Sequence, residues 1–327
     1  MRHALGLLAI LVCGAAGLGE SNTLALEGTV QPDLKKGLAT VSAVTSPFYA
    51  ETAVRNSRFA FRALAPGAYT LTVLDPEWGV TRQTVQVTAS FADGRGRVRV
   101  DVSLERSSAV RSERSVQTAT VSVAKLKVSR KARAAVRSAH AKFAKGDMEG
   151  ATALLRKAVE ISPTFSEAWN ELGTVAYKSG DYTQAERCFR AALEHEPLAF
   201  APMVNLGGAL LSQERYREAL DFNLMARSMQ PRDALANSQL GMNFYHVGQL
   251  HKGLEFLLRA KEADPSHFSH PQMYLAEIYA RLGRLPEAKA ALEETVRLHP
   301  DSPVRQVAES ALSRLSDRLD EQDSPRP

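Results

Sequence analysis

The chain has 327 residues, of which 44% are hydrophobic and 24% are charged, and its formal net charge is +5 at pH 7. This length exceeds that of a usual single domain, so two folded units and a connecting segment are expected. The composition is ordinary for a globular protein and excludes a chain that is disordered or embedded in a membrane throughout.

Residues 1–19 have the features of a secretory signal peptide: a positively charged start, an apolar run over residues 4–12 and small residues over 14–19. Cleavage after Ala16 or after Gly19 satisfies the small-residue rule equally well. A transmembrane anchor is the alternative, but the apolar run is shorter than the ~20 residues that span a bilayer. The expected location is therefore secreted or periplasmic, with no transmembrane span in the mature chain.

Cys13 follows the apolar run, where a lipid-anchored cysteine would stand. Val12, however, precedes it at a position that bacterial lipoprotein signals give to a small residue. A lipid anchor at Cys13 is therefore not expected.

Residues 24–105 show the period-two alternation of β-strands. The clearest example is the row Val98, Val100, Val102 and Leu104, whose members are separated by polar residues. Turn signals such as that at 66–67 divide the segment into about seven short strands, a spacing typical of a small antiparallel sandwich. The sequence therefore predicts an all-β sandwich over residues 24–105.

This segment resembles the carboxypeptidase regulatory-like domain, which has a transthyretin-like sandwich fold. The resemblance rests on Gly-Thr-Val at 28–30, Ala-Thr-Val at 39–41 and above all the Phe-x-Phe strand and Pro-Gly turn within 59–73. Members usually carry an Asp-Gly turn before the Phe-x-Phe strand, where this chain has Asn-Ser-Arg at 56–58, so the hairpin is expected to differ. The resemblance implies an accessory module and no proteolysis, since neither His-x-x-Glu nor His-Glu-x-x-His occurs.

Trp78 lies in a predicted turn of this sandwich. Aromatic rings on sandwich loops can stack on sugars, so Trp78 is a candidate carbohydrate contact. The favoured interpretation is that it closes the edge of the sandwich.

Residues 106–128 are rich in Ser, Thr and Arg and lack periodicity, which predicts a basic linker. Between residues 95 and 133 eleven lysines and arginines stand against three carboxylates, an excess larger than the net charge of the whole chain. A basic stretch between domains more often contacts an acidic surface or stays solvated than binds nucleic acid. Nucleic acid is therefore not an expected partner.

From residue 129 onward the pattern becomes helical and repeats. The prolines that mark the period are separated by 34, 34, 34 and 35 residues: Pro163, Pro197, Pro231, Pro265 and Pro300. Twelve residues before each stands a small residue: Ala151, Ala185, Ala219, Gly253 and Ala288. Seventeen residues before each is the loop position that should end the first helix of a pair, occupied by Gly146, Gly180, Glu214, Gly248 and Gly283.

A 34-residue unit with these small and apolar positions resembles the tetratricopeptide repeat, or TPR. The resemblance covers residues 129–301 as five units. An apolar stripe over 302–320 predicts a capping helix, and the polar segment 321–327 predicts a disordered tail. The expected architecture is a β-sandwich followed by an all-α solenoid of five helix pairs and a capping helix.

The resemblance implies a groove that is lined by the first helix of each unit and binds a protein or peptide. In the family's register the groove positions include Asn170, Thr174, Tyr177, Lys178, Asn205, Gln239, Met242, Tyr245, His246, Tyr274, Glu277 and Arg281. Amides there can hydrogen-bond a peptide backbone, and tyrosines can supply flat contact area.

No catalytic motif accompanies these features. A phosphate-binding Gly-x-x-x-x-Gly-Lys, a Gly-x-Ser-x-Gly and a Cys-x-x-Cys are all missing from the sequence. His267 and His270 have no cysteine or carboxylate beside them, so no metal site and no cofactor are predicted. The sequence predicts an exported, non-enzymatic adaptor or scaffold with a protein or peptide partner. The alternative is a protein whose sandwich binds carbohydrate or an envelope polysaccharide, with the repeats as spacer.

Overall fold

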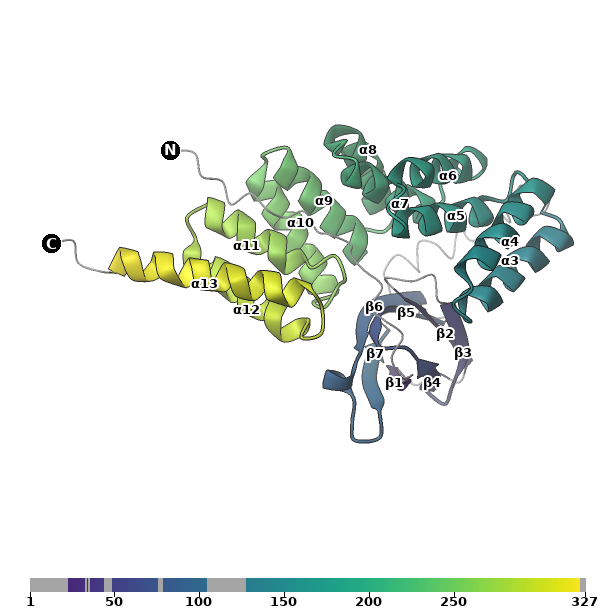
Figure 1. Cartoon of the computed structure of the whole chain (residues 1–327), viewed down its shortest axis with the longest axis horizontal. Helices are drawn as coiled ribbons and strands as arrows, with labels where there is room; N and C mark the ends of the chain where they lie inside the picture. The colour runs from purple at the N-terminus through teal and green to yellow at the C-terminus, as the bar shows by residue number, and fades with distance from the viewer. Residues whose placement is uncertain are drawn as a thin grey trace.

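The structure, a computed structural model, describes residues 23–32, 34, 36–43, 49–75, 79–104 and 128–323. The predicted signal peptide with Cys13, the candidate Trp78 and all but the last residue of the predicted linker lie outside the described residues. The described chain forms a seven-stranded β unit followed by a curved array of helices (Figure 1).

The strands of the β unit are β1 (Leu24–Gln31), β2 (Lys36–Ala43), β3 (Tyr49–Arg55), β4 (Arg58–Leu64), β5 (Gly67–Asp75), β6 (Gly79–Val87) and β7 (Arg97–Ser103). They pair in the order β6-β5-β2-β3-β4-β1-β7. β3 and β4 share the single pair Arg55–Arg58, so the sheet folds over at that hairpin and its two parts face each other. The predicted seven-stranded sandwich is confirmed.

One pairing differs from the expected antiparallel arrangement, because β1 and β7 run parallel from Ala25–Arg97 to Gln31–Ser103. Parallel neighbours need a long connection. Here the chain between the first and last strands passes through all the others before it returns beside β1, and this non-local step left no signal in the alternation pattern.

The hairpin between β3 and β4 keeps a tight two-residue turn despite its unusual sequence. Asn56 and Ser57 have φ angles of 49° and 61°, both in the left-handed region that a type I′ turn requires. The Oγ of Ser57 also accepts a hydrogen bond of 2.8 Å from the Leu34 backbone N–H. The chain thus makes a two-residue turn between β3 and β4 with Asn56 and Ser57.

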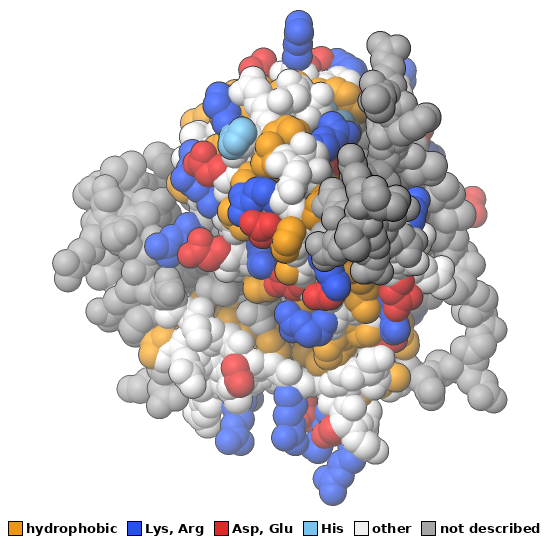
Figure 2. Space-filling model, turned by 90° about the vertical axis from the view of Figure 1, so that its left-hand side faces the viewer, with side chains coloured by type: hydrophobic (Ala, Val, Ile, Leu, Met, Phe, Trp, Pro, Cys, Tyr) orange, Lys and Arg blue, Asp and Glu red, His pale blue; other side chains and the backbone are white. Residues whose placement is uncertain are grey.

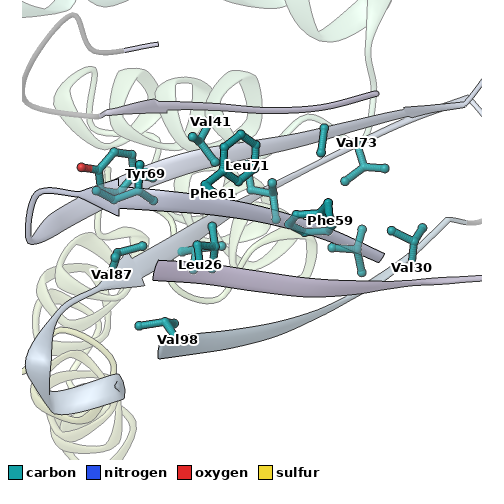
Figure 3. Packing of buried hydrophobic residues seen from close by; sticks show 14 of the residues in the cluster. Leu26, Val30, Val41, Phe59, Phe61, Tyr69, Leu71, Val73, Val87 and Val98 are labelled. Carbon is teal, nitrogen blue, oxygen red and sulfur yellow. The ribbon is translucent and has the colours of Figure 1, made fainter. Parts of the chain in front are cut away.

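The apolar positions of the alternating pattern fill a single core between the two parts of the sheet. Leu26, Val41 and Leu71 are at most 1% exposed, and Phe61 is 4% exposed. Side chains from both parts point toward one another, as Figure 3 shows. Burial of such side chains stabilises the folded state by about 1.5–3 kcal/mol each, before the opposing conformational entropy is counted.

Ten helices form the five predicted pairs: α3 (Arg130–Phe143) with α4 (Met148–Ile161), α5 (Ser166–Lys178) with α6 (Tyr182–His195), α7 (Phe200–Ser212) with α8 (Tyr216–Met229), α9 (Ala234–His246) with α10 (Leu250–Ala263), and α11 (Pro271–Arg281) with α12 (Leu285–Leu298). The capping helix α13 (Val304–Asp323) follows. It continues past the predicted end at 320, so residues 321–323 are helical and were wrongly assigned to the tail. The polar residues at 321–323 are compatible with a helix, and the next helix-breaking residue after them is Pro325.

The loop position predicted to end each first helix does so through a left-handed backbone. Gly146, Gly180, Gly248 and Gly283 have φ angles between 74° and 81°, and Glu214 has the same conformation at 60°. Glycine adopts this region without steric cost, whereas a residue with a Cβ does not. Four repeats therefore use the favourable residue and the third does not.

The sandwich lies against the solenoid, on the inner side of the arc that the helices form (Figure 1). β6 faces the turns that follow the second helices of the last three repeats, and at one of them the Thr84 backbone N–H donates to Asp264 Oδ2 over 2.6 Å. Within the part of the chain that the structure describes, no helix has both the length and the apolar character needed to cross a membrane.

Candidate functional site

The predicted groove residues lie on the first helices α5, α7, α9 and α11. We call the surface that they form the groove face. Residues three or four positions apart share one side of a helix, so positions such as Asn170, Thr174 and Tyr177 on α5 line up along its axis. Successive first helices place corresponding residues side by side: Asn205 Nδ2 on α7 donates a 3.0 Å hydrogen bond to Asn170 Oδ1 on α5.

Aromatic rings from three helices converge on the groove face. The tyrosine cluster consists of Tyr216, Tyr245, His246 and Tyr274. His246 stacks on Tyr216 with ring centroids 4.3 Å apart and an interplanar angle of 4°. Tyr245 and Tyr274 meet edge to face at 5.5 Å, and His246 lies 6.2 Å from Tyr274. Such offset and edge-to-face contacts are the preferred aromatic geometries, and they hold these rings in fixed orientations.

A charged pair borders the cluster on α11 and engages the Tyr245 hydroxyl. The hydroxyl donates to Glu277 over 3.2 Å and accepts from Arg281 Nη2 over 2.6 Å. The guanidinium also lies over the Tyr245 ring, 4.5 Å from its centroid, and pairs with Glu277 over 3.0 Å. Tyr245 is therefore locked by hydrogen bonds at its tip and by a cation over its ring.

Tyr177 extends the aromatic surface toward the second repeat. Its hydroxyl lies 3.0 Å from Ser212 Oγ, and its ring meets Tyr182 at 5.2 Å. Through these contacts Tyr177, which belongs to the second repeat, is joined to Ser212 of the third.

Burial sets the protonation state of these groups. Desolvation raises the pKa of Tyr245 and of Tyr274 to about 12, and it also raises the pKa of Tyr177. The same effect lowers the pKa of His246 below its ordinary value. At neutral pH the phenols keep their protons and the imidazole is uncharged, so the cluster offers neutral rings and hydroxyl donors.

Four predicted groove residues contact other parts of the protein. Gln239 is only 7% exposed and packs over Gly208, where an added Cβ would lie 2.7 Å from its Nε2. The Thr174 hydroxyl donates to the Asn170 carbonyl of its own helix over 3.0 Å. Asn170 and Asn205 bond to each other, as described above. Only Asn170 and Asn205 thus satisfy one another across neighbouring helices, whereas the Thr174 hydroxyl is satisfied within its own helix.

Lys178 has a partner that repeat register could not reveal. Its Nζ donates a 2.9 Å hydrogen bond to the Ala43 carbonyl at the end of β2. Burial lowers the pKa of this ammonium to about 8. Lys178 therefore contacts the sandwich, a unit 135 residues away in sequence.

Tyr216 was missed because it begins a second helix, outside the usual groove positions. A signal for it existed. Tyr182 and Tyr216 both follow the loop between paired helices and lie 34 residues apart, so a tyrosine recurs at one register position in two neighbouring repeats.

The groove face has the chemistry of a non-covalent binding surface: neutral rings, hydroxyls and one charged pair. Among the described residues, no group of three or more His, Cys, Asp or Glu side chains is arranged to hold a metal ion. At the C-terminal end, ion pairs such as Arg284–Glu287 (2.8 Å) link adjacent turns, and Figure 2 shows basic and acidic side chains side by side on this end of the molecule.

Family profiles for the tetratricopeptide repeat match residues 132–165, 170–234 and 272–302. The helical region is built of tetratricopeptide repeats. The curated relatives include tetratricopeptide repeat protein 5 of Mus musculus, 28% identical over 54% of this chain and 45% of the relative. The Homo sapiens protein is 29% identical over 51% and 42%. The chain spans less than half the length of these relatives.

One solved structure is similar in fold over part of the chain. The Cut9–Hcn1 hetero-tetramer of the APC/C superposes with a TM-score of 0.52 at 15% identity, covering 58% of this chain and 37% of that chain. MamA from Desulfovibrio magneticus RS-1 gives a TM-score of 0.45 at 23% identity, covering 60% and 99%. The likeness of residues 24–105 to the carboxypeptidase regulatory-like domain remains a prediction.

Proposed function

We propose that this protein is an exported, non-enzymatic adaptor that holds a segment of a protein partner on the groove face of its TPR solenoid. The observation that carries the proposal is the tyrosine cluster, in which rings from α8, α9 and α11 form one preorganised surface. Tyrosines are enriched at protein interfaces because they bring large contact area and a hydrogen-bonding tip at small cost in side-chain entropy.

The surroundings of the cluster define the segment that it suits. Glu277 and Arg281 border the rings with opposite charges. A partner segment that places an aromatic or aliphatic side chain on the rings and polar groups beside the charged pair would match this surface. Because Tyr245 is already held in place, binding loses little additional side-chain entropy.

Site-specific photocrosslinking tests this proposal in the full chain. A benzophenone amino acid at Met242, on the groove face beside the cluster, is expected to capture a partner from the native extract. The matched control replaces Leu224, which is 42% exposed on the second helix α8. Capture that is stronger at Met242 and lost on adding Tyr245→Ala and Tyr274→Ala supports groove binding. Equal capture at both positions contradicts it.

Export and the role of the sandwich form the second part of the proposal. Export rests on the leader pattern at residues 1–19. N-terminal sequencing of the mature protein should begin at residue 17 or 20, and an intact Met1 in an intracellular fraction contradicts export. The sandwich is proposed to be an accessory module. Loss of polysaccharide binding in Trp78→Ala, with photocrosslinking at Met242 unchanged, would support the carbohydrate alternative for that module.

A further inference from the structure

The outer edge of β6 lies on a row of polar side chains from the solenoid. We call this row the ridge, and it consists of Gln230, Asp233, Asp264 and His299. Gln230, Asp264 and His299 occupy the same position in three successive repeats: each follows the second helix and precedes the marker proline. The ridge is therefore a periodic feature of the repeats, made of turns rather than of the groove face.

Alternate residues of β6 meet successive repeats along the ridge. Arg82 donates to Gln230 Oε1 over 3.1 Å and lies 3.6 Å from the Asp233 carboxylate. The Thr84 N–H, two residues after Arg82, donates to Asp264. The Gln86 side-chain amide, two residues after Thr84, lies 3.4 Å from His299 Nδ1. Every second residue of the strand therefore contacts the next repeat of the solenoid.

These contacts use the free edge of the sheet. Among the strands that the structure describes, β6 pairs only with β5. In an antiparallel pair, alternate residues direct their N–H and C=O groups away from the partner strand. Thr84 is one of the residues whose backbone groups point away from β5, because its N–H donates to Asp264. Arg82 and Gln86 lie two residues before and after it and so have the same orientation. Unpaired edges are templates for association with another strand. The ridge covers this edge with side chains.

Asp264 recognises the backbone of the strand. Asp264 is only 4% exposed, and burial raises the pKa of its carboxyl group although hydrogen bonds from Thr84 favour the charged form. A buried carboxylate needs strong donors, and a strand edge supplies one with its N–H. Asp233 adds an acidic group, 11% exposed, for a basic side chain.

The interface is polar and incompletely satisfied, which favours reversible contact. His299 Nε2, His270 Nδ1 and Thr88 Oγ1 are buried without a hydrogen-bond partner among the residues that the structure describes. The Arg82 guanidinium also lies over the Phe200 ring of the solenoid, 5.9 Å from the ring centroid. Units joined by such polar surfaces move relative to one another more readily than those joined by large apolar ones.

We propose that the ridge is a docking surface for the edge of an extended β-strand, occupied in cis by β6, and that a protein partner with an exposed basic strand replaces β6 there. The fitting strand carries a lysine or arginine for Asp233 two residues before the N–H that meets Asp264. This surface is distinct from the tyrosine cluster, so the inference goes beyond the function proposed above.

A labelled peptide with the sequence of residues 79–88 serves as the probe, and its binding to the full chain is measured by fluorescence anisotropy. Wild type binds it weakly, because the tethered β6 competes at an effective concentration on the order of millimolar. Arg82→Glu places a carboxylate opposite Asp233 and releases β6, so hydrogen exchange at residues 82–86 speeds up and peptide affinity rises about tenfold or more. Arg99→Glu, the same change at a side chain 69% exposed on β7, alters neither.

Two further changes test the role of Asp264. Adding Asp264→Ala to Arg82→Glu abolishes the gain in affinity. A peptide N-methylated at the residue equivalent to Thr84 loses binding as well, and this change leaves the protein untouched, so misfolding cannot explain the result. Tyr245→Ala leaves peptide binding unchanged.

The proposal would be overturned by unchanged exchange in Arg82→Glu, by faster exchange without a gain in affinity, or by equal binding of the N-methylated peptide. Loss of binding in Tyr245→Ala would place the peptide on the groove face. That outcome rejects the ridge and leaves the adaptor function standing.

Discussion

The sandwich and the solenoid bury their apolar residues in different ways. One continuous core in the sandwich joins Leu24 in the first strand to Leu104 after the last. The solenoid has a succession of smaller cores, such as that of Phe189 and Leu206 from neighbouring repeats. Non-local contacts make a unit fold as a whole, whereas nearest-neighbour contacts make stability a sum of local terms. The two units should therefore respond differently to equally severe mutations.

The largest expected effect is that of Phe61→Ala in the sandwich. Phe61 is 4% exposed and packs edge to face with Phe59 at 6.0 Å, so truncation should cost about 3–5 kcal/mol. Hydrogen exchange measured by mass spectrometry should show all seven strands losing protection together. Leu240→Ala, at a fully buried position of α9, is the matched change in the solenoid and should cost about 2–5 kcal/mol. Its effect should concentrate in the fourth repeat and its neighbours, and uniform loss over all repeats would contradict the comparison.

Acidification should weaken the boundary between the two units. Burial lowers the pKa of His299 to about 4 and that of His270 and His267 to about 3. As the pH falls, these histidines take up protons in the unfolded chain before they do so in the folded protein. The free energy of unfolding is therefore at its full value above about pH 6.5 and falls as the pH drops toward 4. Each buried imidazole should cost about 2 kcal/mol at pH 5 relative to pH 7. Burial raises the pKa of Asp264, which acts in the opposite direction.

Urea unfolding of wild type and His299→Asn at both pH values isolates the contribution of His299. The variant should lose about 2 kcal/mol less between pH 7 and pH 5. Identical losses in the two proteins would show that His299 is not held neutral at the boundary.

A moderate effect is expected for Gly173→Ala, where two paired helices approach closely. An added Cβ would lie 2.5 Å from the Phe189 ring, so overpacking should cost about 1–3 kcal/mol. Phe189→Leu in the same chain removes the ring and should recover part of the loss. Thermal unfolding of both variants tests this, and an additive result would show that the ring is not the cause.

The smallest effect is a gain in stability from Glu214→Gly. The left-handed backbone at Glu214, with φ of 60°, is unfavourable for a residue with a Cβ. Relief of this strain, offset by the greater entropy of glycine in the unfolded chain, should stabilise the third repeat by up to about 1 kcal/mol. Gly180→Ala at the same position of the second repeat should change stability by a similar amount in the opposite direction. Destabilisation by Glu214→Gly would contradict the strain argument.

The periodic features of the chain could be predicted from the sequence. The proline spacing located the helix pairs, and the glycine position located the turns that the structure shows at Gly146 and Gly248. The alternation of Val98, Val100 and Val102 located a strand. These predictions succeed because each depends on residues within one turn or one strand, where local geometry decides which side chains are buried.

The candidate site was only partly predictable. Register placed Tyr245, His246 and Tyr274 on one face, and the structure brings them together. Gln239 and Lys178 differ because a neighbouring helix and a distant strand engage them. The position of a residue within a repeat predicts which side of its helix it occupies. It does not predict which other part of the protein packs against that side.

The sequence alone determined the two folded units, the repeat length and the residues available to each face, since these follow from local periodicity. Tertiary structure decided the parallel pairing of β1 with β7, the contact of Lys178 with the Ala43 carbonyl and the placement of β6 on the ridge. Each of these joins residues far apart in the chain, and the free energy of such contacts depends on how whole units pack together.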